Sequence, residues 1–121
     1  LFDSTSWGNY KDSKFNFTGK YSTDYGDNFT DATASTEKPE NSSYLLGTGV
    51  TEYTKKNNIY DLAGNCWEWT TESSSSSSRV CRAGNYDDVG LANAAYSRYN
   101  VYSADDSRYD VSFRAALYVS L

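Results

Sequence analysis

Two cysteines carry the most reactive side chains in this 121-residue sequence, which contains no histidine. Without imidazole there is no histidine ligand for a metal, no Ser-His-Asp or Cys-His nucleophile and no proton shuttle near neutral pH. A disulfide between Cys66 and Cys81 would close a loop worth about 3 kcal/mol in the chain-entropy model. Two alternatives stay open, a disulfide or two separate buried thiols.

Tyrosine is strongly over-represented, with 12 copies against no methionine and one proline. Tyrosine supplies a large contact area at low entropic cost, and Ser, Asn and Asp supply adaptable hydrogen bonds, as in antibody binding loops. The composition therefore indicates ligand binding. A loop-rich extracellular domain without such a surface is the simpler alternative.

Length and charge limit the remaining classes of function. A chain of this length fits one domain, residues 1–121. Its 16 acidic and 11 basic residues give a net charge of -5, which argues against a nucleic-acid partner. No apolar run approaches the length of a membrane span, so no membrane insertion is expected.

Short strands joined by long loops are the elements expected to position these side chains. Residues 1–57 are predicted to be loop-rich, with strands at 14–18 and 43–46, because they show no helical periodicity. Residues 31–43, which contain the single proline, are predicted to be an exposed connection.

Residues 58–84 are predicted to form a hairpin scaffold. The stretch 66–71 alternates like a strand with both tryptophans on one face, six serines follow at 73–78, and 79–82 is again extended. With a midpoint near residue 73 or 74, the two cysteines would lie nearly opposite each other.

Residues 111–121 are predicted to be the final strand, because alternate residues from Val111 to Val119 are apolar. Residues 85–111, between the hairpin and this strand, are rich in Tyr, Asp, Ser and Asn. Such a segment is too polar for a core and too aromatic for an idle surface. We therefore expect the ligand to bind there.

Three ordered motifs occur in the second half: IYDLAGNCWEWT at 59–70, RVCRAGNY at 79–86 and SFR at 112–114. In type, order and spacing they resemble the formylglycine-generating-enzyme superfamily, over about residues 58–121. The resemblance implies an α+β fold of the C-type lectin type. The helices and first strand that normally open that fold are not visible in this sequence, so we expect the chain to be mostly strands and long loops with little helix and the N-terminal part of that fold to be missing.

The resemblance further implies that the chain is not an enzyme. In the oxidases of the superfamily two cysteines flank an Arg-Tyr pair, and the matching positions here hold Tyr96 and Val101. A phenol and an isopropyl group cannot replace soft thiolate ligands. The iron-dependent relatives use histidine ligands, which this sequence lacks. No cofactor is therefore expected.

The remaining branch of the superfamily contains ligand-binding proteins diversified by retroelements, such as phage tropism determinants. Residues 87–110 resemble their variable region. In such regions adenines of Asn codons are randomised, and Tyr, Asp and Ser are each one base change from an Asn codon, which matches the residue types of this segment. This implies an extracellular receptor-binding or adhesion domain on a virion or bacterial cell surface, with a protein or glycan of a host or target cell as its partner. The alternatives are a fixed-specificity lectin or adhesin of the same fold and a degenerate formylglycine-generating enzyme.

The ligand-binding side chains are expected in and beside this variable region, with Tyr99 and Tyr102 contributing most of the affinity. Tyrosine anchors of this kind dominate many interfaces. The expected set is Asp87, Asp88, Val89, Leu91, Ser97, Tyr99, Asn100, Val101, Tyr102, Arg108, Tyr109 and Asp110.

Scaffold roles are expected at the motif positions. Glu68 is costly to bury alone and is expected to pair with Arg82 or Arg114. Because Ala83 replaces the first glycine of the family's pair, only Gly84 is expected to need special backbone geometry. The expected scaffold set is Trp67, Glu68, Trp69, Arg82, Gly84, Phe113 and Arg114.

A structural calcium ion is a weaker expectation. Relatives bind calcium near the loop that matches residues 60–66, and Asp61 offers a hard oxygen ligand there. The alternative is a solvated acidic loop.

Overall fold

This computed structural model describes residues 3–103 and 105–115 of the chain. These residues contain nine β-strands in three sheets. The N-terminal sheet has the order β2-β1-β3 and consists of β1 (Phe15–Ser22), β2 (Thr30–Lys38) and β3 (Leu45–Leu46). A two-stranded sheet pairs β4 (Lys55–Lys56) with β5 (Ile59–Tyr60).

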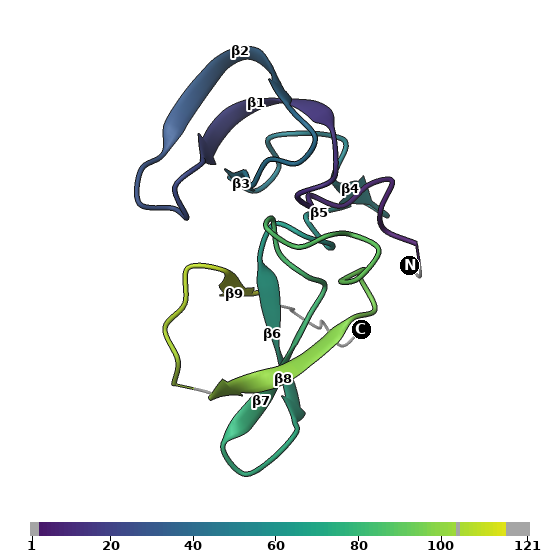
Figure 1. Cartoon of the computed structure of the whole chain (residues 1–121), viewed down its shortest axis with the longest axis vertical. Coiled ribbons are helices and arrows are strands. Elements are labelled where there is room, and N and C mark those ends of the chain that lie inside the picture. Colours follow the sequence, from purple (N-terminus) through teal and green to yellow (C-terminus); the bar gives the residue numbers. More distant parts are fainter. Residues whose placement is uncertain (1–2, 104, 116–121) are drawn as a thin grey trace, which may run out of the picture.

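The C-terminal sheet has the order β8-β7-β6-β9. It consists of β6 (Trp67–Ser73), β7 (Ser78–Arg82), β8 (Arg98–Ser103) and β9 (Val111–Phe113). Figure 1 shows this sheet and the N-terminal sheet at opposite ends of the long axis, with the β4–β5 pair near the middle.

The expected α+β fold of the C-type lectin type is wrong, because the described residues form strands, turns and bends and no helix. The connecting segments are rich in Asn, Asp, Ser and Gly, whose side chains or flexibility favour turns over helix interiors. Four asparagines adopt positive φ in these turns: Asn41, Asn57, Asn58 and Asn65. Within residues 3–103 and 105–115 no helix exists that could cross a membrane.

The segment predicted as an exposed connection, residues 31–43, is instead mostly strand. Its residues up to Lys38 belong to β2, which pairs antiparallel with β1. The sequence of this strand shows no apolar alternation, because only two of its side chains, Ala32 and Lys38, are buried. Phe15 and Phe17 of β1 supply the apolar side of the hairpin, so β2 needs little apolar character of its own.

The predicted hairpin at 66–82 is confirmed, with β6 and β7 paired antiparallel on either side of the serine loop. The predicted final strand is confirmed only for β9, which runs parallel to β6. Arg114 and Ala115 are not in a strand, and residues 116–121 lie outside the described residues. Of the predicted strand at 111–121, the structure therefore confirms only the first three residues.

The two halves of the chain meet where the backbone of Asn9 crosses that of Gly64. The amide of Asn9 donates to the carbonyl of Ala63 at 3.1 Å, and the amide of Asn65 donates to the carbonyl of Asn9 at 2.8 Å. Gly64 has φ +69, and a Cβ there would lie 2.2 Å from the carbonyl oxygen of Asn9. Only glycine permits this approach.

Gly64→Ala is expected to destabilise the protein by about 3 kcal/mol or more, because backbone atoms of Asn9 would have to move. Gly49→Ala is the matched control, since Gly49 also has positive φ but a Cβ there would meet only the Tyr60 ring at 3.8 Å. Its cost should be the left-handed backbone strain alone, about 1 kcal/mol. Urea denaturation measures both, and equal losses would contradict the crossing.

Lys38 is fully buried at the end of β2. Its Nζ donates to the carbonyl oxygens of Ser13 at 2.7 Å and Lys11 at 3.4 Å. Burial lowers the pKa of Lys38 from 10.5 to about 8, and the negative charges of Asp12 and Glu40 oppose only part of this shift. Between these pH values the folded protein therefore binds fewer protons than the unfolded chain.

The Lys38 contribution to stability is expected to increase as the pH rises from 8 to 10.5, because the unfolded chain loses its proton later. The gain in the free energy of unfolding is at most about 3 kcal/mol. Urea denaturation of wild type and Lys38→Met over this range isolates the contribution, since all other titrating groups are shared. A difference between the two proteins that stays constant with pH would contradict the lowered pKa.

Candidate functional site

The C-terminal sheet sorts its side chains onto two faces. Two adjacent rows of paired residues across β6, β7 and β8 are Trp69, Cys81, Tyr99 and Glu68, Arg82, Arg98. Neighbours along a strand point to opposite faces, so the two rows face opposite sides. We call the side with Tyr99 the aromatic face and the side with Arg82 the charged face.

A bulge in β8 brings a second tyrosine onto the aromatic face. Cys81 pairs with Tyr99 and Arg79 pairs with Tyr102, so β8 has one residue more than β7 between these two pairs. Because of this extra residue, Tyr102 lies on the same face of the sheet as Tyr99 although the two are three residues apart. The Tyr99 and Tyr102 ring centroids are 5.3 Å apart as a result, in an edge-on arrangement.

Both tryptophans of β6 support these tyrosines, as their predicted position on one face requires. The Trp67 ring stacks on Tyr99 at 5.4 Å between centroids, and Trp69 meets Tyr102 edge-on at 6.3 Å. Trp67 is buried, whereas Tyr99 remains 39% exposed. Tyr99 is thus a fixed aromatic ring that still faces solvent.

Arg108 extends this cluster with a positive charge. Its guanidinium carbon lies 4.1 Å from the Tyr102 ring centroid, within the range of a cation–π interaction. Its Nε and Nη2 donate to the two carboxylate oxygens of Asp110 at 2.9 and 3.3 Å, which raises the pKa of Arg108. Asp110 is buried and also accepts a hydrogen bond from the side-chain amide of Asn85 at 3.2 Å. Asp110 therefore orients Arg108 from beneath.

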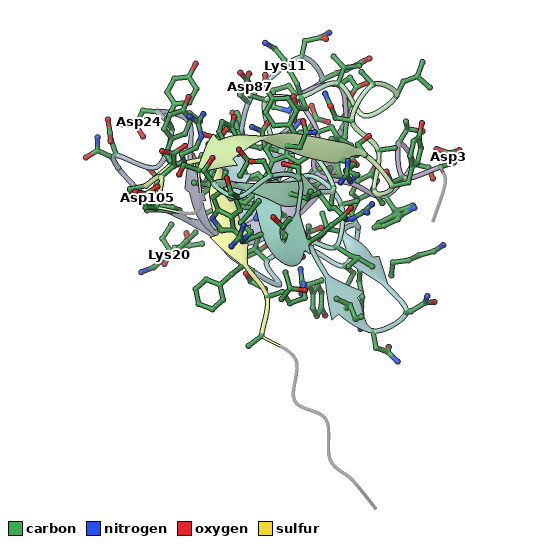
Figure 2. All side chains as sticks on the ribbon, turned by 90° about the horizontal axis from the view of Figure 1, so that it is seen from below. Asp3, Lys11, Lys20, Asp24, Asp87 and Asp105 are labelled. Atoms are coloured by element: carbon green, nitrogen blue, oxygen red, sulfur yellow. The ribbon has the colours of Figure 1, made fainter. Side chains whose placement is uncertain are left out.

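Tyr25 joins this surface from the N-terminal half, and sequence reasoning missed it. Its ring meets Tyr109 edge-on at 5.3 Å, and both residues are more than half exposed. In Figure 2, Asp24 of the β1–β2 loop and Asp105 of the segment after β8 lie on the same side of the molecule. The only local signal was a tyrosine beside glycine in a turn, which gives no information about a partner distant in sequence.

The loop at 85–93 contacts the N-terminal half instead. Asp87 accepts from Lys11 Nζ at 3.4 Å and from Ser43, and Figure 2 shows Asp87 beside Lys11. The Asp88 carboxylate accepts a hydrogen bond from the backbone amide of Asn85, and burial raises the pKa of Asp88. Of these two carboxylates, both expected to contact ligand, Asp87 attaches the loop to the N-terminal half and Asp88 holds the loop's own structure.

The other expected ligand residues divide between exposed and structural positions. Val89 and Leu91 project from the 85–93 loop, with Leu91 80% exposed. The Ser97 hydroxyl donates to the Ala92 carbonyl at 3.4 Å, and Asn100 is exposed on β8. The backbone of Val101 belongs to β8, and its side chain lies outside the described residues.

The predicted pairing of Glu68 with Arg114 is confirmed. Arg114 Nε donates to both carboxylate oxygens of Glu68, at 2.9 and 3.2 Å. Arg82 pairs instead with Glu72 at 2.9 Å, and Arg98 donates to the other oxygen of Glu72 at 2.7 Å. These two arginines hold the pKa of Glu72 below its usual value.

Two other scaffold expectations need correction. Gly84 has φ +71 as predicted, but Ala83 also has φ +82, because its amide and carbonyl bind Ser97 and Gly64 respectively. Phe113 is 79% exposed and is no buried anchor. It borders a cavity of about 310 Å³ whose lining also includes Phe29 and Leu45.

The disulfide alternative is wrong, because Cys66 and Cys81 are both free. Cys81 pairs with Trp69, so Cys66 lies three residues along the chain from the position opposite Cys81. Cys66 precedes β6, and an offset of three residues along an extended chain is about 10 Å, beyond disulfide geometry. Burial raises the pKa of Cys66 to about 12 and of Cys81 to about 11, so neither is a thiolate nucleophile near neutral pH.

The loop at Asp61 already holds a cation from the protein itself. Arg114 Nη2 donates to the carbonyl oxygens of Tyr60 at 3.1 Å and Asp61 at 3.2 Å. The Asp61 carboxylate accepts from the Gly49 amide, and burial raises its pKa. In residues 3–103 and 105–115 no three His, Cys, Asp or Glu side chains gather to hold a metal ion. The expected calcium site at Asp61 has no support.

Comparisons with protein-family models, with curated proteins and with solved structures found no match.

Thiol chemistry tests the free cysteines. The native protein should react slowly with a disulfide reagent at pH 8, because both pKa values lie well above that pH. Unfolding in guanidinium should release two thiols per chain, and reduction should leave the intact mass unchanged. A mass increase of about two hydrogens on reduction would contradict the structure.

Proposed function

We propose that this protein is a non-catalytic ligand-binding domain whose recognition surface is the aromatic face around Tyr99 and Tyr102. One observation carries the proposal: two neighbouring tyrosine rings are held on one face by Trp67 and Trp69 and are flanked by Arg108. Aromatic and arginine side chains of this kind are the commonest interface anchors.

Rigidity supports this proposal over a mobile, tyrosine-rich loop. Tyr99 and Tyr102 lie on a strand that is paired with β7, and Arg108 is fixed by the buried carboxylate of Asp110. Side chains that are already ordered lose less entropy on binding. The aromatic face can therefore use most of its contact energy for affinity.

We further propose that the chain belongs to the retroelement-diversified ligand-binding branch of the formylglycine-generating-enzyme superfamily, and that it acts extracellularly on a virion or bacterial cell surface. Its partner would be a protein or glycan of a host or target cell. Motif residues with structural roles support this proposal, among them Asn65, the Glu68–Arg114 pair and Gly84.

Sequencing the DNA beside the gene tests the diversification. We expect a near-copy of the segment that encodes residues 85–114, with mismatches confined to adenines of the copy. Absence of the copy would overturn the diversification and leave a fixed-specificity lectin or adhesin, for which a glycan array is the direct assay.

Tyr102→Ala is expected to weaken binding by about 2 kcal/mol, because it removes an anchor that also supports Tyr99 and Arg108. The ligand is first identified by screening arrays of glycans and surface proteins with the full chain, and affinities are then measured by surface plasmon resonance. Leu91→Ala is the comparison, since Leu91 is exposed but projects from the 85–93 loop. A large loss with Leu91→Ala and none with Tyr102→Ala would contradict the proposed surface.

A further inference from the structure

A cavity of about 480 Å³ lies beside β6 and the end of β7. Its volume falls within the range of small-molecule sites, roughly 300–1,000 Å³. Its lining is mostly apolar, and its charged side chains are two arginines and one glutamate, beside which Thr70 adds a hydroxyl. The lining residues are Leu62, Glu68, Trp69, Thr70, Arg82, Ala83, Ala95, Tyr96 and Arg114.

The polar members of this lining belong to the ion-pair network of the charged face. Glu72 bridges Arg82 and Arg98 at 2.9 and 2.7 Å, and Glu68 accepts two hydrogen bonds from Arg114. Among the charged side chains that line the cavity, Arg82 and Arg114 outnumber Glu68 by one. This excess occurs in a chain whose net charge is -5, so the lining of the cavity differs in sign from the protein as a whole.

The two lining arginines are held in place and keep hydrogen-bond donors for a ligand. Arg82 uses Nη2 for Glu72 and Nη1 for the carbonyl of Tyr96, while Arg114 uses Nε and Nη2. A guanidinium offers five N–H donors, more than these contacts use. Each remaining N–H can donate to one oxygen of a carboxylate.

We infer that this cavity binds a small monocarboxylate with an apolar body. The carboxylate lies at Arg82 and Arg114, and the apolar body lies against Leu62, Ala83 and Ala95. The single excess positive charge matches a single negative charge on the ligand. A free inorganic anion would leave the apolar lining unfilled, and a neutral apolar molecule would leave the arginine donors unused.

This site is independent of the proposed recognition surface. Arg82 alternates with Cys81, which lies in the row of Tyr99, so the arginine and the tyrosines lie on opposite faces. Trp69 is the one residue shared, because its ring meets Tyr102 while it also borders the cavity. Either site can therefore fail its test without the other.

Isothermal titration of the full chain with three probes tests the inference. Phenylacetate carries both the carboxylate and the apolar body, phenylacetamide lacks the charge, and acetate lacks the ring. We expect phenylacetate to bind about tenfold or more tightly than either of the others, as a charge-assisted hydrogen bond and ring burial require. Equal binding of phenylacetate and phenylacetamide, or no saturable binding of phenylacetate, would overturn the inference.

Two variants locate the site, with thermal melting as the check on folding. Arg82→Gln should weaken phenylacetate binding about tenfold and leave phenylacetamide binding unchanged, while Glu72 keeps Arg98 as its partner. Ala95→Leu should weaken both by filling the cavity, and no ionic group changes. If Ala95→Leu does not fold, Arg82→Gln alone decides.

Tyr99→Ala is the control from the aromatic face and should leave phenylacetate binding unchanged. An equal loss with Tyr99→Ala would place the probe on the aromatic face and overturn the inference. Light scattering is measured in parallel. A dimer that Ala95→Leu converts to monomer would show that a second copy covers the cavity, which also overturns it.

Discussion

The close crossing of Asn9 over Gly64 and Asn65 is the constraint on which the rest of the structure depends. Without a Cβ at Gly64 the two backbones approach, and the Asn65 side chain then binds the amide and carbonyl of Leu46 at 2.8 and 3.0 Å. The Asn65 carbonyl accepts from the Tyr86 amide at 3.0 Å. One residue thus connects the N-terminal segment, the β1–β2–β3 sheet and the loop that follows β7. Because buried backbone groups need partners, a change here disturbs all of them at once.

Strand alternation in the C-terminal sheet separates two kinds of chemistry. Aromatic rings gather on one face, where the bulge in β8 adds Tyr102 beside Tyr99. Arginine–glutamate pairs gather on the other face, which borders the larger cavity. Exposed ion pairs add little to stability individually. Their main effect here is to hold the arginine side chains in place, which prepares the charged face for an anion.

Local patterns predicted those features that depend on neighbours in the chain. The β6–β7 hairpin and the common face of the tryptophans were accessible in this way. The β2 strand was not, because its burial comes from Phe15 and Phe17 on a neighbouring strand. The failed disulfide has a similar cause, since the strand register is set by pairing over the whole hairpin. The described residues form no helix, because their connecting segments are rich in turn-forming residues. The α+β expectation came from the family resemblance and did not take these connections into account.

The sequence by itself determined that the chain is rich in tyrosine and small polar side chains and that histidine chemistry is excluded, and it predicted an arginine partner for Glu68. Tertiary structure decided which tyrosines share a face, that Tyr25 meets Tyr109, and that Asp87 contacts Lys11. It also placed Arg114 on the carbonyls where calcium was expected. The physical reason is the same in each case. Side-chain type is a local property, whereas register, bulges and backbone crossings arise only when segments distant in the chain compete for the same hydrogen bonds and the same space.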